Sequence, residues 1–127
     1  MKRLSIPRLY TIIDSNVADY HGWTVTSLAS AYLDGGATLL QLRCRDRETS
    51  EILLWADEIV ARASRYDARV IINDRTDIAR LSGTDGVHLG QEDLSVSAAR
   101  SIGGSGLAIG LSTHSFVQVQ RALAQSV

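Results

Sequence analysis

The stretch TLLQLRCRDRETSEILLWADEIVARASRYDARVIIND, residues 38–74, holds two short apolar segments on either side of a longer amphipathic one. Thr38–Arg43 and Arg69–Asn73 are rich in leucine, isoleucine and valine, which is typical of buried strands. Between them, Thr49–Ala63 carries apolar residues at spacings of three and four, which predicts a helix with one buried face. A strand, a covering helix and a second strand together predict a βαβ unit with parallel strands.

The same alternation continues on both sides of this unit, without a linker or a low-complexity segment. The pattern predicts an α/β protein with about five βα units in a single domain over residues 1–127, in which helices cover a parallel sheet. The other predicted strands are Leu9–Asp14, Asp85–Gly90 and Leu107–Ser112, and the other predicted helices are Val25–Leu33, Asp77–Leu81, Ser97–Ile102 and Phe116–Ala124.

Two architectures fit this pattern, and the pattern alone slightly favours the first. A doubly wound sheet of five strands would be complete at this length. A (β/α)8 TIM barrel has eight units, so the chain would be a barrel truncated to about five. In a barrel we expect Ile71, Val87 and Leu111 to face the interior. In the last helix we expect Phe116, Val119 and Leu123 to face inward, because these apolar residues recur at helical spacing.

Composition gives no reason to expect nucleic acid or a membrane as a partner, because the formal net charge is −1 and 21% of residues are charged. No apolar run is long enough for a membrane span, and the N-terminal residues lack the apolar core of a signal peptide. Cys44 is the single cysteine, which excludes an internal disulfide and a zinc site built from several thiolates. We therefore expect a cytoplasmic protein.

Polar side chains follow each predicted strand, at the ends that form the ligand face in both architectures. Arg43 and Arg45 share one side of an extended segment, and guanidinium groups suit phosphate oxygens. Asp74 and Asp93 follow neighbouring strands, and Mg²⁺ typically binds one or two protein carboxylates together with substrate phosphates. The sequence therefore predicts a Mg²⁺–diphosphate site. By contrast, we expect Cys44 to face the helices.

The segments GGATLLQLRCRD (35–46), VIINDRTDIA (70–79), GTDGVHLGQEDL (83–94) and IGLSTHS (109–115) occur in the order and at the spacings of one known family. The chain resembles thiamine phosphate synthase over nearly its whole length. Because that family is a (β/α)8 barrel, the resemblance favours the barrel over the doubly wound sheet.

The resemblance implies a transferase of thiamine biosynthesis, which joins hydroxymethylpyrimidine diphosphate to a thiazole phosphate and releases pyrophosphate. It implies Mg²⁺ as the cofactor, and no side chain is assigned as a catalytic residue. By position in the motifs, it implies substrate contacts at Gln41, Arg43, Arg45, Asn73 and Ser112, and Mg²⁺ ligands at Asp74 and Asp93.

The sequence departs from the family in two ways. Arg45 stands where the motif has lysine, which keeps the charge but changes its geometry. The family's strands six to eight, which carry the thiazole-phosphate site, are absent, so we expect the chain alone to be inactive and to self-associate through its open sheet edges. Two alternatives stay open: an isomerase resembling thiazole tautomerase, and a non-catalytic fragment that binds diphosphates. His88 is expected to pack or to hydrogen-bond within the sheet.

Overall fold

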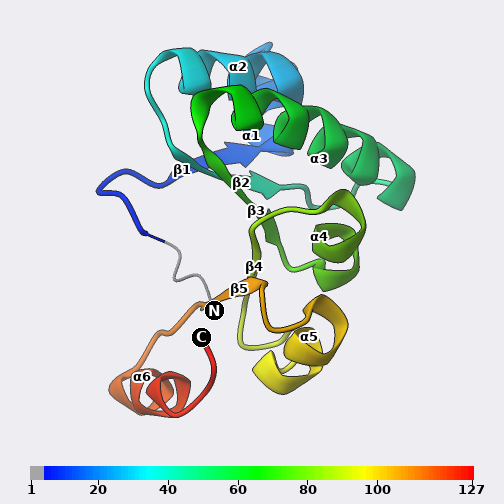
Figure 1. Ribbon diagram of the computed structural model, residues 1–127. Coiled ribbons are helices and arrows are strands. Elements are labelled where there is room, and N and C mark those ends of the chain that lie inside the picture. The colour runs from blue at the N-terminus through cyan, green and yellow to red at the C-terminus, as the bar shows by residue number, and fades with distance from the viewer. Residues whose placement is uncertain (1–4) are drawn as a thin grey trace.

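A computed structural model describes residues 5–127 of the chain, in which strands and helices alternate (Figure 1). No helix among these residues is both long and apolar enough to span a bilayer. The elements in chain order are β1 (Thr11–Asp14), α1 (Ser15–Tyr20), α2 (Val25–Asp34), β2 (Leu39–Arg43), α3 (Thr49–Ala63), the 3-10 turn η1 (Ser64–Tyr66), β3 (Arg69–Asn73), α4 (Thr76–Ser82), β4 (Gly86–Leu89), α5 (Val96–Gly103), β5 (Ala108–Leu111) and α6 (Phe116–Leu123).

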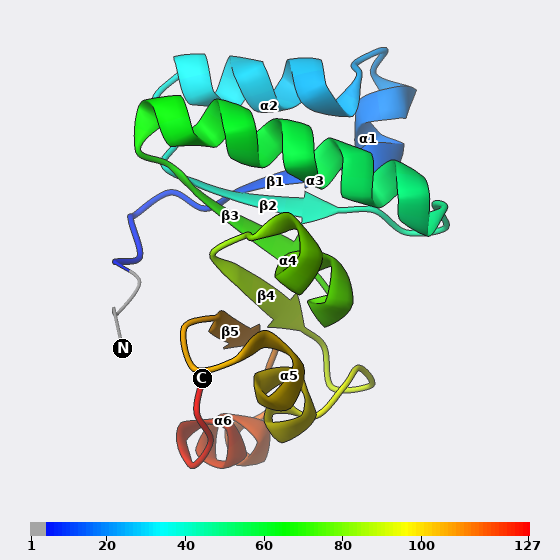
Figure 2. The same ribbon diagram turned by 45° about the vertical axis from the view of Figure 1, so that its right-hand side comes forward.

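The five strands form one parallel sheet in the order β1-β2-β3-β4-β5. In a doubly wound sheet the strand order reverses at a switch point, so strands that follow each other along the chain are not all neighbours in the sheet. This sheet has no such point, which excludes the doubly wound alternative and matches consecutive units of a barrel. The sheet is curved, with α1 to α5 on one side of it (Figure 2), and within residues 5–127 it does not close, because β1 and β5 each pair with one strand.

Most predicted elements are confirmed, and α3 and β3 begin and end at the predicted residues. Helix α1 was not predicted, because its six residues carry no apolar periodicity. It begins where the Asp14 carboxylate accepts hydrogen bonds from the backbone N–H groups of Asn16 and Val17, at 2.9 and 3.2 Å. A single capping side chain therefore starts this helix at the end of β1.

The hydrophobic core lies between the sheet and its helices. In α3, Ile52, Ala56, Ile59 and Ala63 are buried on one face, as the spacing predicted. The strands contribute the alternate residues that point to the helices, since successive side chains of a strand point to opposite faces. These strand residues are Ile13, Leu40, Leu42, Val70, Ile72, Val87, Leu89 and Ile109.

Two of the three residues expected in the barrel interior were placed on the wrong face. Ile72 pairs with Val87 in the sheet, and both belong to the core beneath the helices. Leu111 packs against the same core. Ile71 lies outside this core cluster and pairs with Gly86. The inner face of β4 is therefore formed by Gly86 and His88 and not, as predicted, by Val87.

The prediction for α6 was also wrong. Phe116, Val119 and Leu123 are 75%, 40% and 79% exposed, and Ala122 is the buried residue of this helix. In Figure 1, α6 lies at one end of the molecule, apart from the helices that cover the sheet. Its apolar residues are exposed because no element of residues 5–127 packs over them.

A substitution at Gly86 tests the packing between β4 and β5. A Cβ atom at Gly86 would lie 2.5 Å from the Ala108 carbonyl oxygen and 2.8 Å from Ile71 Cδ1. Gly86→Ala is expected to lower the free energy of unfolding by about 1–3 kcal/mol, since backbone must move to admit the methyl group. Urea denaturation measures this change. Gly106→Ala is the matched control, because a Cβ there meets nothing within 4 Å; equal effects of the two substitutions would contradict the strand pairing.

Candidate site at the carboxyl ends of the strands

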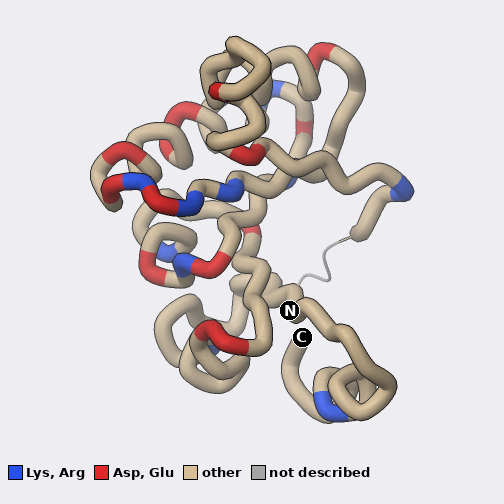
Figure 3. The backbone as a smooth tube through the Cα atoms, turned by 180° about the vertical axis from the view of Figure 1, so that it is seen from behind, with Lys and Arg blue, Asp and Glu red and all other residues tan. Residues whose placement is uncertain are grey.

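Parallel pairing brings the carboxyl ends of all five strands to one end of the sheet. The register pairs Asp14 with Arg43 and Asn73 with His88, so residues at or next to the ends of neighbouring strands lie side by side. Acidic and basic positions gather together on the left of Figure 3, which is the side toward which β1 and β2 run in Figure 1. The predicted site residues therefore come from different strands but meet at one end.

Asp74 and Asp93 face each other at this end. Asp74 follows β3 in the left-handed backbone conformation (φ 66°), and its N–H donates to the His88 carbonyl oxygen at 2.8 Å. Asp93 accepts a hydrogen bond from the Gly90 N–H at 2.6 Å. Burial, together with the hydrogen bond and negative charge of Asp93, raises the pKa of Asp74 to about 6. The two acids thus form a like-charge pair that a cation would relieve.

Arg43 and Arg45 supply positive charge to the same place. Both charges lower the pKa of Asp74, against the larger effects of burial and Asp93, so both arginines lie within electrostatic reach of that carboxyl. Nη1 of Arg43 lies 3.4 Å from Asp14 Oδ2. Arg45 is exposed. The end of β2 therefore presents one anchored and one exposed guanidinium group toward the acidic pair.

Cys44 lies between these arginines and points the other way. It is half-buried and packs against the hydrophobic core, which confirms its predicted orientation. Burial raises the pKa of its thiol to about 11, although the nearby Ser15 hydroxyl and the charge of Arg47 lower it. The thiol is therefore neutral at pH 7 and packs as a small apolar group.

Gln41 is buried on the inner face of the sheet, with 4% of its surface exposed. Its Nε2 donates to the Tyr10 hydroxyl at 2.8 Å. Burial raises the pKa of Tyr10, and the hydrogen bond to Gln41 lowers it in part. Sequence reasoning missed Tyr10, although the pairing of Ile12 with Gln41 places Tyr10 on the same face of β1.

His88 and Ser112 join β4 to the end of β5. His88 Nε2 lies 2.8 Å from Ser112 Oγ, and burial lowers the pKa of His88 while the charge of Asp93 raises it. A Cβ at Gly110 would lie 2.6 Å from His88 Nδ1, so the ring needs glycine there. Gln91 Nε2 donates to the Ser112 carbonyl oxygen at 2.7 Å. Hydrogen bonding by His88 was predicted, but its contact with a candidate site residue was not.

The donor set at this end fits Mg²⁺ shared with a phosphate-bearing ligand. Within residues 5–127, no three His, Cys, Asp or Glu side chains gather into a cluster that could hold a metal ion. Asp74 and Asp93 supply two carboxylates, and Mg²⁺ usually completes its shell with water and substrate phosphate oxygens. Two cavities, of about 580 and 490 Å³, lie elsewhere, against α2 and α3 and against the loop that precedes β5.

Comparison with known proteins supports the same family. A family model described as thiamine monophosphate synthase matches residues 9–127. The thiamine-phosphate synthase of Koribacter versatilis is 41% identical over 94% of this chain and 57% of its own length. The enzyme of that name from Acidothermus cellulolyticus is 40% identical over 94% of this chain and 55% of its own length.

A solved structure agrees with the sequence comparisons. The thiamine phosphate pyrophosphorylase from Pyrococcus furiosus superimposes with a TM-score of 0.84 at 27% identity, over 93% of this chain and 56% of that one. The chain spans about half the length of these relatives. With a family match over residues 9–127 and relatives about 40% identical over 94% of it, the chain belongs to the thiamine monophosphate synthase family.

Proposed function

We propose that this chain carries the pyrimidine-diphosphate half of a thiamine phosphate synthase active site. The enzyme would be a transferase that joins hydroxymethylpyrimidine diphosphate to a thiazole phosphate and releases pyrophosphate. The observation that carries the proposal is that Asp74 and Asp93, with Arg43 and Arg45, lie at the carboxyl ends of neighbouring parallel strands, where their charges affect one another. Two acids and two arginines together are suited to a divalent cation and a diphosphate at one place.

We assign each side chain the role that the family resemblance implies. Asp74 and Asp93 would hold Mg²⁺, which neutralises negative charge on the diphosphate as its bond to carbon breaks. Arg43 and Arg45 would bind the diphosphate oxygens. The remaining contacts, which would orient the pyrimidine and its diphosphate, are assigned to Gln41, Asn73 and Ser112.

No general base is assigned, because the reaction does not depend on one from this chain. Charge builds on the leaving diphosphate as its bond breaks, so groups that stabilise that charge more in the transition state than in the substrate accelerate the step. Burial lowers the pKa of His88 below its ordinary value, which favours the neutral imidazole. Its contact with Ser112 supports a role in orienting the hydroxyl group.

Of the alternatives, an isomerase resembling thiazole tautomerase is disfavoured by the acidic pair, because a reaction without a diphosphate has no use for two facing carboxylates. The second alternative is a non-catalytic fragment that binds diphosphates, and within residues 5–127 the sheet has two open edges. Ile12 on the edge strand β1 is 46% exposed. We include self-association through these edges in the proposal, and cytoplasm as the compartment, which suits a free cysteine.

Binding of pyrophosphate tests the proposed function directly. In calorimetric titrations with Mg²⁺ and pyrophosphate, Arg43→Ala is expected to weaken binding about tenfold or more, because a charge-assisted hydrogen bond is lost. Cys44→Ala is the matched control and should bind within about twofold of the unmodified chain, since Cys44 packs against the core. Equal losses in the two variants, or no Mg²⁺-dependent binding at all, would refute the proposal.

The Asp74–Asp93 pair should also make the stability of the folded chain depend on pH. The pKa of Asp74 is about 6 in the folded chain against 3.8 for the free group, so the folded state holds this proton more tightly than the unfolded state. Stability should therefore fall as the pH rises from about 4 to about 6. Asp74→Asn removes this loss and is expected to be about 1 kcal/mol more stable than the unmodified chain near pH 7.5 without Mg²⁺. Asparagine also tolerates the left-handed backbone at this position.

Urea denaturation at both pH values measures the difference, which should disappear near pH 4. Asp67→Asn is the control, because Asp67 is exposed and has a similar left-handed backbone (φ 51°) away from the acidic pair. A gain of the same size at both pH values, or the same gain in the control, would show that Asp74 and Asp93 do not repel each other.

A further inference from the structure

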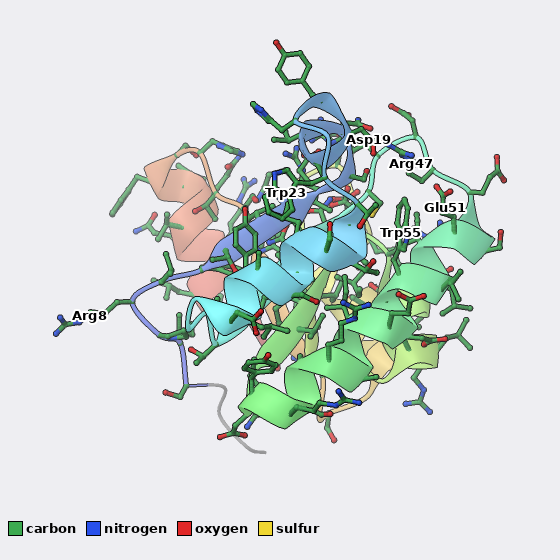
Figure 4. All side chains as sticks on the ribbon, turned by 90° about the horizontal axis from the view of Figure 1, so that it is seen from above. Arg8, Asp19, Trp23, Arg47, Glu51 and Trp55 are labelled. Carbon is green, nitrogen blue, oxygen red and sulfur yellow. The ribbon has the colours of Figure 1, made fainter. Side chains whose placement is uncertain are left out.

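The segment that follows β2 changes direction before it reaches α3. Continued alternation of side chains would turn Arg47 to the same side as Arg43 and Arg45. Asp46 instead adopts the left-handed backbone conformation (φ 56°), which ends the extended segment. Figure 4 shows Arg47 beside Asp19 on one side and near Glu51 and Trp55 on the other. Its guanidinium group thus lies between α1 and α3 and does not join the acidic pair.

Arg47 binds both helices at once. Its Nη2 donates to Asn16 Oδ1 at 3.3 Å and also to the Asp19 carboxylate, both in α1. Its Nη1 lies 3.7 Å from Glu51 Oε1, and its Cζ lies 5.7 Å from the centre of the Trp55 ring, both in α3. The Arg47 side chain is 23% exposed. A planar guanidinium group can make these contacts simultaneously, which the single ammonium group of lysine cannot.

The contacts of Arg47 hold one end of residues 43–47, and the contact of Arg43 with Asp14 holds the other end. Arg43, at the end of β2, pairs with Asp14 at the end of β1. Arg47 then attaches the same segment to α1, which begins directly after Asp14. Residues 44–46 therefore lie between two attachments to the β1–α1 unit, and Arg45 stands within them.

We propose that Arg47 is a positioning residue, which holds residues 44–48 so that Arg43 and Arg45 face the Asp74–Asp93 pair and the diphosphate bound there. This role rests on the proposed function for its consequence in binding, while the positioning itself is a property of the loop. Without Arg47, the segment would sample other conformations, and binding would have to restrict them again. The loss should appear as weaker binding of the diphosphate.

Two variants distinguish an effect of Arg47 on the position of the loop from an effect of its charge on pyrophosphate binding. Arg47→Ala is expected to weaken binding of pyrophosphate with Mg²⁺ about five- to tenfold in calorimetric titrations. Asp19→Ala removes a negative charge near a site for an anion, so charge alone predicts equal or tighter binding. Positioning predicts weaker binding by about the same factor as Arg47→Ala. Asp19 is 57% exposed, so this variant should fold. Arg65→Ala, on the exposed turn η1, is the control for loss of an arginine.

Two further readouts distinguish this role from a general loss of stability. In an Arg45→Ala background, Arg47→Ala should weaken binding less than it does in the unmodified chain, because of the two positioned groups only Arg43 remains, and Asp14 also holds it. Hydrogen exchange of the backbone amides of residues 44–48 should become about tenfold faster in Arg47→Ala and Asp19→Ala and remain unchanged in Arg65→Ala.

The outcomes separate this inference from the proposed function. Unchanged exchange in residues 44–48, or equal or tighter binding by Asp19→Ala, would overturn the positioning role. If the unmodified chain does not bind pyrophosphate while exchange accelerates as expected, the proposed function fails and the positioning of the loop by Arg47 stands.

Discussion

Two neighbouring strands can pair in parallel only if the chain between them returns along the length of the sheet, and here a helix makes each return. Because every strand then runs the same way, every strand also ends at the same edge. The end of β1 meets the end of β2 through Asp14 and Arg43, and the end of β3 meets β4 through Asn73 and His88. Residues distant in sequence become neighbours for this reason alone. The chemistry of the candidate site is therefore a consequence of the sheet's topology.

At that edge the protein contains local features that lower its folding stability. Asp74 is a non-glycine residue in the left-handed region, and it faces a second carboxyl group that raises its pKa. Such features lower folding stability, and their occurrence together is more frequent at binding sites. The surrounding contacts hold them in place: the Asp74 N–H binds the His88 carbonyl, and Asp93 is fixed by the Gly90 N–H. The same backbone bonds that continue the sheet thus hold the acids together.

Sequence reasoning succeeded where one physical signal dominated. The apolar spacing of Thr49–Ala63 and the run Arg69–Asn73 gave correct bounds for α3 and β3, because burial of one helical face and of a whole strand leaves a clear pattern. The gathering of Arg43, Arg45, Asp74 and Asp93 at one end followed from parallel strands.

Sequence reasoning failed where the burial of a residue, or a contact that it makes, depends on another element of the fold, which a local sequence pattern does not identify. Which face of β4 is buried is set by its register with β3, so Val87 was assigned to the wrong side. The capping of α1 by Asp14, and the contact of His88 with Ser112 beside Gly110, each depend on single atoms brought together by the fold. The amphipathic pattern of α6 predicts a buried face only if another element covers it, and none in residues 5–127 does.

The central claim is that Asp74 and Asp93 hold one divalent cation jointly with a diphosphate. It is tested most directly by a crystal structure of the chain grown with Mn²⁺ and pyrophosphate, in which anomalous scattering locates the metal. The account predicts one metal within about 2.5 Å of an oxygen from each carboxylate and of the pyrophosphate, with Arg43 and Arg45 on the remaining phosphate oxygens. A metal bound elsewhere, or a pyrophosphate bound away from this pair, would contradict it.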